Sequence, residues 1–269
     1  MIFETHAHYD DVQFDSDRDE IIKEVKDRGV ERIVDIGAKA ESFERIEGLT
    51  LRYDFIYGTA GLHPLYLKPD INQYLKLIKE YALKDKFVAI GEIGLDYHDD
   101  RRLAGCFGLS EVTDSKVLHK RQQEWFEVQL SLARELKLPV VIHSREAAKD
   151  TLDIVKAVGA RDIVGVIHCF SYSKEVARDF LNMGFFLGIG GVVTYGNSRK
   201  VKETVEYMPF DRLVVETDSP YLAPEPLRHK RNDSGNLRTI IKTIADIKGV
   251  YPEEIEDITW ENGMRLYGF

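Results

Sequence analysis

Two histidines separated by one alanine stand near the start of the chain, in the stretch "FETHAHYDD" at residues 3–11. His6 and His8 end a short apolar run, and side chains two residues apart on a strand point to the same side. Two imidazoles held in this way can bind a divalent metal ion. They can also be two surface histidines near a terminus. One His-x-His motif does not separate these alternatives, so the rest of the chain must decide between them.

Four further residues of metal-ligating type end apolar, β-branched runs: Glu92, His143, His168 and Asp218. Imidazoles and carboxylates suit two divalent cations of the Mg, Mn or Zn type better than copper(I) or an iron–sulfur cluster. Each residue alone has an ordinary explanation. A histidine at a strand end is often a hydrogen-bonded polar group, and a Glu or Asp before a helix can be its N-cap.

Eight short runs have the composition of strands, and amphipathic segments separate them. Five of the runs are almost continuously apolar, which is typical of parallel strands covered on both faces. Ser16 and Ser173 are expected helix N-caps, and Gly29 and Gly184 the matching stops. The eight expected strands are Ile2–His6, Arg32–Ile36, Phe55–Ala60, Phe87–Glu92, Pro139–His143, Ile163–His168, Phe185–Ile189 and Leu213–Asp218.

This alternation predicts an α/β fold, a single (β/α)8 TIM barrel over residues 1–269, because no linker marks a domain boundary. An open, doubly wound sheet is the alternative, but no glycine-rich phosphate loop follows the first strand. A barrel gathers its active site at the carboxyl ends of its strands. The six ligand-type residues end five of the expected strands. Their coincidence on that face favours the metal site.

Three features near this face have less certain roles. His63, in "GLHP", has three possible roles: it contacts the substrate, it hydrogen-bonds to a metal ligand, or it is a turn histidine before Pro64. Cys169 follows His168, and alternation is expected to turn it away from the barrel mouth. The fourth and fifth strands start 52 residues apart, against 22 to 32 elsewhere, so residues 101–117 are predicted to be a loop insertion. The insertion is a lid, a substrate rim or a surface excursion.

Composition limits the function classes. The chain has 43% hydrophobic and 31% charged residues and no apolar run near the length of about 18 that a membrane span needs. Two cysteines and the absence of a leader-like start predict a cytoplasmic protein without disulfides. A net charge of −9 argues against a protein that coats nucleic acid, but not against an enzyme that reaches phosphate through metals and local arginines such as those of "RHKR" (228–231).

The motifs "THAHYD", "GLHP", "IGEIGLDYH", "LPVVIHSRE", "VIHCFS", "LGIGGVVTY", "VVETDSPYL" and "KRND" together resemble the TatD family of metal-dependent deoxyribonucleases, which belongs to the amidohydrolase-like barrels. The likeness runs from the first strand to the final helix. It implies a hydrolase with two divalent cations (Mg, Mn or Zn). One would be held by His6, His8, Glu92 and Asp218, and the other by Glu92, His143 and His168.

The resemblance also assigns roles. Glu92 would bridge the metals and Asp218 would accept the proton of the attacking water, so these two are the catalytic residues. Substrate contacts would be His63, Arg145, Arg231 and Asn232. Two features depart from the family: Asp233-Ser234 stands where Glu-Pro usually follows Arg-Asn, and the stretch after "GLDYH" is longer than usual.

The activity implied by the resemblance is cleavage of DNA phosphodiester bonds, from the 3′ end of single strands. The same metals would serve attack on a carbonyl in a cyclic amide, an ester or an aminoacyl-tRNA equally well, because fold does not decide function. A non-catalytic metal- or nucleic-acid-binding protein is a third reading, disfavoured by the complete ligand set and the water-activating carboxylate. We expect a DNA partner, no membrane and no obligate protein partner.

Overall fold

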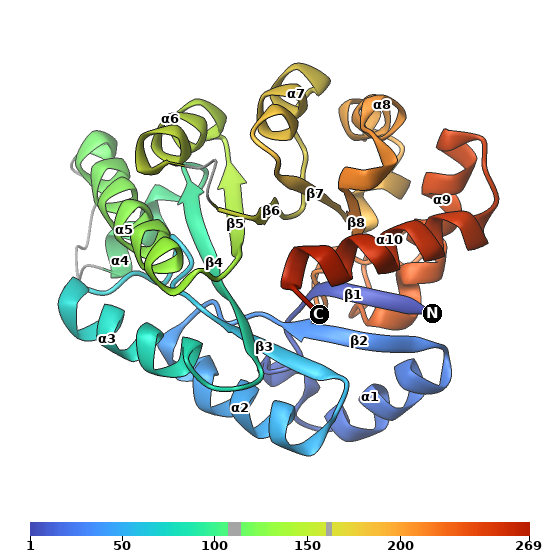
Figure 1. The fold of residues 1–269 in the computed structure, drawn as a ribbon, viewed down its shortest axis with the longest axis horizontal. Coiled ribbons are helices and arrows are strands. Elements are labelled where there is room, and N and C mark those ends of the chain that lie inside the picture. Colours follow the sequence, from blue (N-terminus) through green and yellow to red (C-terminus); the bar gives the residue numbers. More distant parts are fainter. Residues whose placement is uncertain (107–113, 160–162) are drawn as a thin grey trace.

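The protein is described by a computed structural model that covers residues 1–106, 114–159 and 163–269. Eight parallel strands follow one another around a single sheet in chain order, from β1 to β8. A bridge between Ala7 and Ser219 links β1 to the segment after β8, and Asp218 N–H donates to the carbonyl of His6 at 2.9 Å. These contacts nearly close the barrel. Helices surround the strands (Figure 1), which confirms the predicted (β/α)8 architecture.

The strands are shorter or longer than the apolar runs suggest. β4 continues past Glu92 to Asp96, and β5 continues to Arg145, because the two strands stay paired as far as Asp96 and Arg145. β6 and β8 end before His168 and Asp218. The bounds are β1 Ile2–Ala7, β2 Val30–Asp35, β3 Ile56–Ala60, β4 Phe87–Asp96, β5 Val140–Arg145, β6 Gly165–Ile167, β7 Phe186–Ile189 and β8 Leu213–Val215.

The helices pack one apolar stripe onto the sheet. In α9, Ile240, Ile241 and Ile244 are buried, and the helix ends at Gly249, which adopts the left-handed conformation that glycine tolerates best. The bounds are α1 Arg18–Asp27, α2 Phe43–Arg52, α3 Ile71–Ala82, α4 Asp100–Cys106, α5 Ser115–Leu136, α6 Ala148–Val158, α7 Lys174–Asn182, α8 Arg199–Tyr207, α9 Leu237–Lys248 and α10 Pro252–Tyr267.

Two helix starts test the predicted caps. Asp17, rather than Ser16, precedes α1, so that prediction is wrong by one residue. Ser173 does precede α7, as expected. The predicted insertion at 101–117 is partly helical, since α4 and the start of α5 occupy its two ends. Residues 107–113 lie outside the described part of the chain.

One cluster of apolar side chains, all buried except the half-buried Tyr57, takes a member from every strand and packs against α10, as expected for a barrel interior closed at one end by a helix. The strand members are Phe3, Val34, Tyr57, Ala89, Val141, Val166, Phe186 and Val214. The hydroxyl of Tyr267 in α10 donates to the carbonyl of Thr5 at 2.8 Å. This end of the barrel is therefore sealed, and the opposite end is where a site can open. No helix in the described ranges is long and apolar enough to cross a membrane.

Candidate metal centre

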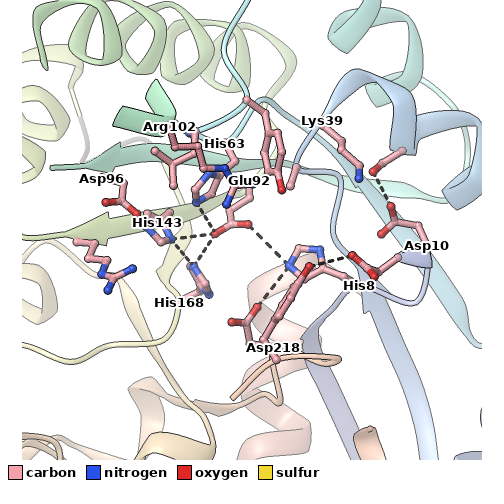
Figure 2. Close-up of a pocket in the computed structure, with 17 residues that line it drawn as sticks. His8, Asp10, Lys39, His63, Glu92, Asp96, Arg102, His143, His168 and Asp218 are labelled. Carbon is pink, nitrogen blue, oxygen red and sulfur yellow. Dashed lines mark hydrogen bonds and ion pairs between the residues drawn. The ribbon is translucent and has the colours of Figure 1, made fainter. Parts of the chain in front are cut away.

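A pocket of about 310 Å³ opens at the carboxyl end of the strands (Figure 2). Five of the six predicted ligands line it, and the sixth, His6, is fully buried next to them. The structure therefore brings all six together. The lining residues are His8, Asp10, Asp11, Ala38, Lys39, Ser42, His63, Leu65, Tyr66, Glu92, Asp96, Arg102, His143, Arg145, His168, Asp218 and Tyr221.

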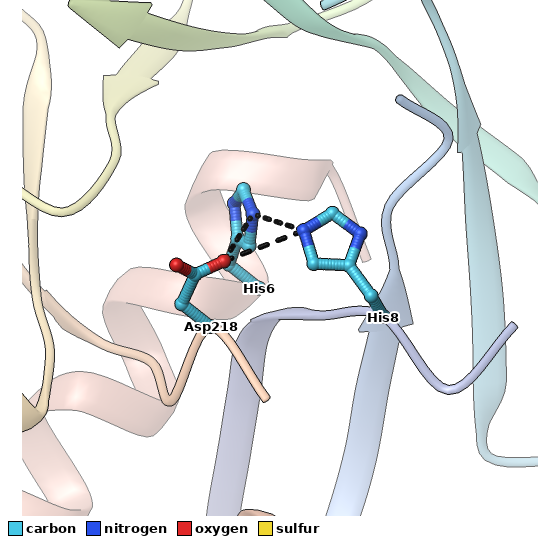
Figure 3. Close-up of side chains that lie close together, drawn as sticks. All are labelled: His6, His8 and Asp218. Carbon is cyan, nitrogen blue, oxygen red and sulfur yellow. Dashed lines mark hydrogen bonds and ion pairs between the residues drawn. The ribbon is translucent and has the colours of Figure 1, made fainter. Parts of the chain in front are cut away.

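His6, His8 and Asp218 form one compact group (Figure 3). The two Nε2 atoms lie 3.2 Å apart, and Asp218 Oδ1 lies 3.5 Å from Nε2 of His6 and 3.3 Å from Nε2 of His8. The Asp218 backbone is left-handed, with φ of 56°. That conformation, with its N–H bonded to His6, aims a carboxylate from beyond β8 at the two imidazoles of β1. Three donors at these separations fit one divalent cation.

Glu92 lies between two sets of imidazoles. Its Oε1 is 2.7 Å from Nε2 of His168 and 3.1 Å from Nδ1 of His143. Its Oε2 faces the other way, 3.9 Å from Nε2 of His6 and 3.8 Å from Nε2 of His8. One carboxylate oxygen of Glu92 thus faces His143 and His168, and the other faces His6 and His8. Because β4 runs on to Asp96, Glu92 acts from within a strand rather than from its end.

The site favours positive charge. Burial alone would raise the pKa of Glu92, but the neighbouring imidazoles, His168 first, hold it well below its usual range. Burial would likewise lower the pKa of His8, but the carboxylate of Asp218 raises it to about 10. Carboxylates that stabilise a proton on a buried imidazole stabilise a divalent cation in its place, and metal binding then releases that proton. The donor set therefore fits bound metal.

Two of the candidate ligand rings are oriented by hydrogen bonds of their second nitrogen. His8 Nδ1 lies 3.0 Å from the carbonyl of Ile36, and His143 Nε2 lies 3.2 Å from Oδ2 of Asp96. Such partners fix the tautomer that leaves the other nitrogen free for a metal. The Nδ1 of His6 has no hydrogen-bond partner among the described residues.

Glu216 lies beside His168, with its Oε1 3.7 Å from Nδ1, but this nitrogen, like Nδ1 of His6, has no hydrogen-bond partner among the described residues. Sequence reasoning missed Asp96 and Glu216, the carboxylates behind His143 and His168. Asp96 stands four residues after Glu92 and Glu216 two before Asp218, so nearness to a ligand in an apolar strand was the available signal. Glu216 also accepts the N–H of Cys169. Burial, followed by the charges of Asp218 and Glu216, raises the pKa of the Cys169 thiol well above its usual range.

Two of the predicted substrate contacts do line the pocket. His63 packs against His143, with ring centroids 4.3 Å apart, and its Nε2 lies 3.7 Å from Oε1 of Glu92. Burial lowers the pKa of His63 to about 3, so its imidazole is neutral. Arg145, at the end of β5, lines the pocket and is exposed. A cation and a neutral imidazole are thus available beside the ligands.

Arg231 and Asn232 are placed differently from the prediction, since neither is among the described residues that line the pocket. Arg231 donates to the carbonyl of Gln13 and, at 2.9 and 2.5 Å, to the carboxylate of Asp17. Asn232 is buried and donates to the carbonyls of Thr217 and Tyr221. The loop after β8 thus brings Arg231 onto Asp17 at the start of α1, and no residue of "RHKR" is among the described residues that line the pocket.

Lys39, Tyr66, Arg102 and Tyr221 also line the pocket. Loops after different strands supply these residues. No periodicity in the sequence marks them.

Comparisons with known proteins identify the family. The family described as TatD related DNase matches residues 3–268. A Bacillus subtilis protein named uncharacterized metal-dependent hydrolase YabD is 41% identical over 267 residues, which cover 99% of each chain. A Mus musculus protein named putative deoxyribonuclease TATDN3 is 32% identical over 278 residues, covering 99% of this chain and 88% of that one.

Solved structures give the same result. The crystal structure of YJJV, a TatD homolog from Escherichia coli, superposes with a TM-score of 0.88 at 26% identity, covering 100% of this chain and 98% of that one. The likeness spans the barrel from β1 to α10, and the clustered imidazoles and carboxylates stand at its open end. The chain therefore belongs to the TatD related DNase family, and it is a metal-dependent hydrolase of that family.

Proposed function

We propose that the protein hydrolyses phosphodiester bonds of DNA with two divalent cations, Mg, Mn or Zn. The observation that carries the proposal is the placement of Glu92, whose two carboxylate oxygens face two separate imidazole sets. In the proposed ligand assignment, His6, His8, Glu92 and Asp218 would hold one cation, and Glu92, His143 and His168 would hold the other. Glu92 would thus serve both, and paired divalent cations are typical of phosphodiester hydrolysis.

The cations, when bound, supply Lewis acidity for the attacking water and for the oxygens of the phosphate. The chain's own residues supply the rest. Asp218 is the proposed general base, because its carboxylate lies at the pocket between the imidazoles of β1 and open space. Arg145 binds a non-bridging oxygen, which its planar guanidinium suits. His63, being neutral, donates a hydrogen bond to the phosphate or to the leaving oxygen.

The proposed substrate is single-stranded DNA, cleaved from its 3′ end. The family description and the name of the mouse relative support DNA as the substrate class. A pocket of about 310 Å³ at the end of a barrel suits a strand end rather than a long duplex. The net charge of −9 agrees with this, because long-range attraction of a duplex needs a basic face.

The test is an activity panel on metal-stripped protein to which Mg, Mn or Zn is restored separately. The substrates are 3′-ended single-stranded DNA, duplex DNA, a phosphomonoester, a cyclic amide and an aminoacyl-tRNA. We expect hydrolysis of the single strand with at least one metal. Hydrolysis confined to the cyclic amide or the aminoacyl-tRNA would overturn the phosphodiester proposal and favour the carbonyl alternative.

Replacing Glu92 with alanine tests the bridging assignment. We expect Glu92→Ala to lose bound metal and activity together, because both proposed metals share this carboxylate. Metal content is measured by elemental analysis and folding by circular dichroism. The matched control is Glu127→Ala, which removes a carboxylate from an exposed position of α5. Full metal content and activity in folded Glu92→Ala would refute the assignment.

A further inference from the structure

Three loops on one side of the pocket each contribute a side chain that neither the sequence motifs nor the metal site explains. Lys39 follows β2, Tyr66 follows β3, and Arg102 lies in α4 after β4. These three strands are neighbours in the sheet, so their loops are adjacent. Figure 2 shows Lys39 and Arg102 on the opposite side of Glu92 from Asp218. The pocket thus has a basic side that is separate from the water-activating side.

Tyr66 brings the two cations together. The guanidinium carbon of Arg102 lies 4.6 Å from the centroid of the Tyr66 ring, and Nζ of Lys39 lies 5.7 Å from it. Cation–π contacts at these distances position a charged group against the ring. Tyr66 is itself fixed, since its N–H donates to the carbonyl of His63 at 2.8 Å. The ring therefore links the basic side chains to the loop that carries His63.

The acidic lining residues are themselves engaged. Asp10 lies beside Lys39 and accepts a hydrogen bond from Ser42, and Asp11 accepts one from the hydroxyl of Tyr221 at 2.8 Å. Arg145 is assigned to the phosphate that is cut. A further phosphate of the substrate would be attracted by Arg102 and Lys39, the two cations that contact the Tyr66 ring.

We propose that Lys39, Tyr66 and Arg102 form a second anion subsite, which binds the phosphate next to the scissile one in an oligonucleotide. This inference rests on the proposed phosphodiester hydrolysis and adds what that function leaves open: the substrate carries at least two phosphates. In a chain cut from its 3′ end, the neighbouring phosphate lies on the 5′ side of the scissile bond. Arg102 lies in α4, at the start of the segment predicted as an insertion, so this helix would contribute to substrate selection.

A pair of dinucleotides isolates the subsite. Thymidylyl-thymidine, TpT, and its 5′-phosphorylated form, pTpT, contain the same scissile bond and differ by one terminal phosphate. One charge-assisted hydrogen bond at a partly exposed site is worth about a factor of ten. We therefore expect wild-type protein to have a kcat/KM for pTpT about tenfold above that for TpT. Most of the difference should lie in KM, because the extra phosphate is remote from the reacting atoms.

Substitutions then assign the preference to residues. Arg102→Ala and Lys39→Ala are each expected to lower the pTpT/TpT ratio of kcat/KM towards one. Tyr66→Phe should keep the ratio and Tyr66→Ala should lower it, because the ring rather than the hydroxyl holds the cations. The matched control is Arg101→Ala, which removes the same charge from the adjacent, exposed position of α4 outside the pocket lining. That control should keep the wild-type ratio.

The outcomes separate the subsite from the proposed function. Equal kcat/KM for TpT and pTpT in the wild type would overturn the subsite and leave phosphodiester hydrolysis standing. An equal fall for both substrates in Arg102→Ala would also overturn it, because the arginine would then act on the scissile phosphate. Cleavage of neither dinucleotide, together with turnover of a cyclic amide or an ester, would overturn both proposals.

Discussion

The carboxylate of Asp96 offers a sharp test of how the metal ligands are held. Asp96 is buried, its Oδ2 lies 3.2 Å from Nε2 of His143, and its Oδ1 accepts the N–H of His98 at 2.9 Å. Asn in this place has nearly the same shape but one acceptor fewer. If its NH₂ group faces His143, the imidazole must carry its proton on Nδ1, the atom that faces Glu92. If the NH₂ group faces His98 instead, it meets the backbone N–H of His98, and two donors cannot form a hydrogen bond.

Either arrangement loses one charge-assisted hydrogen bond, worth roughly 1.5–3 kcal/mol. That loss corresponds to a fall of about ten- to a hundredfold in affinity for a metal held through His143. The other proposed set, His6, His8, Glu92 and Asp218, shares only Glu92 with this one, and the Asp96 carboxylate bonds to His143 and His98 rather than to any of its members. We therefore expect Asp96→Asn to weaken one of two binding phases and to leave the other unchanged.

Calorimetric titration of metal-stripped protein with Mn²⁺ measures both phases. Asp150→Asn is the matched control, because Asp150 accepts hydrogen bonds from Tyr97 and Gln123 and touches no proposed ligand. Wild-type affinity in both phases for folded Asp96→Asn would refute the orienting role. Equal weakening of both phases would refute the division of the ligands into two sets.

Two further predictions concern stability. Gly94 has a φ of +137°, and a Cβ there would lie 1.9 Å from the carbonyl oxygen of His143. Gly94→Ala should therefore lower the free energy of unfolding by about 3 kcal/mol or more and the Tm by roughly 6 °C. Gly48→Ala, whose Cβ meets nothing within 4 Å, is its control, and an equal Tm for both variants would contradict the packing argument. The hydrogen bonds from Arg231 hold the pKa of Asp17 below its usual range. The ion pair therefore stabilises the fold at pH values above the unfolded pKa of about 3.9. This stabilisation is lost as the pH falls through the pKa that Asp17 has in the folded protein. Asp17→Asn should therefore lower the free energy of unfolding by at most about 1 kcal/mol at pH 7. Urea titrations should show this difference shrinking as the pH falls below the unfolded pKa of about 3.9; a difference that does not change with pH would exclude the ion pair as its cause.

The ligand set was predictable because its signals are local. Continuous apolar runs mark parallel strands, and parallel strands bring their carboxyl ends to one face. His6, His8, His143, His168 and Asp218 each stand at or just beyond such an end, so residue type and position in the run placed them together. Glu92 was found by the same rule, although β4 continues beyond it. The rule therefore identified the correct face of the barrel even where a strand boundary was wrong.

The sequence alone determined the barrel and the side chains that meet at its open end, because strand periodicity and residue type are properties of a few neighbouring positions. Only the tertiary structure decided the surroundings of that site. Arg231 binds Asp17, which lies 214 positions away in the chain. Arg102 and Lys39 both contact the ring of Tyr66, and the three residues follow three different strands. Which partner a long side chain finds depends on how loops pack against one another. No period in the sequence encodes that packing.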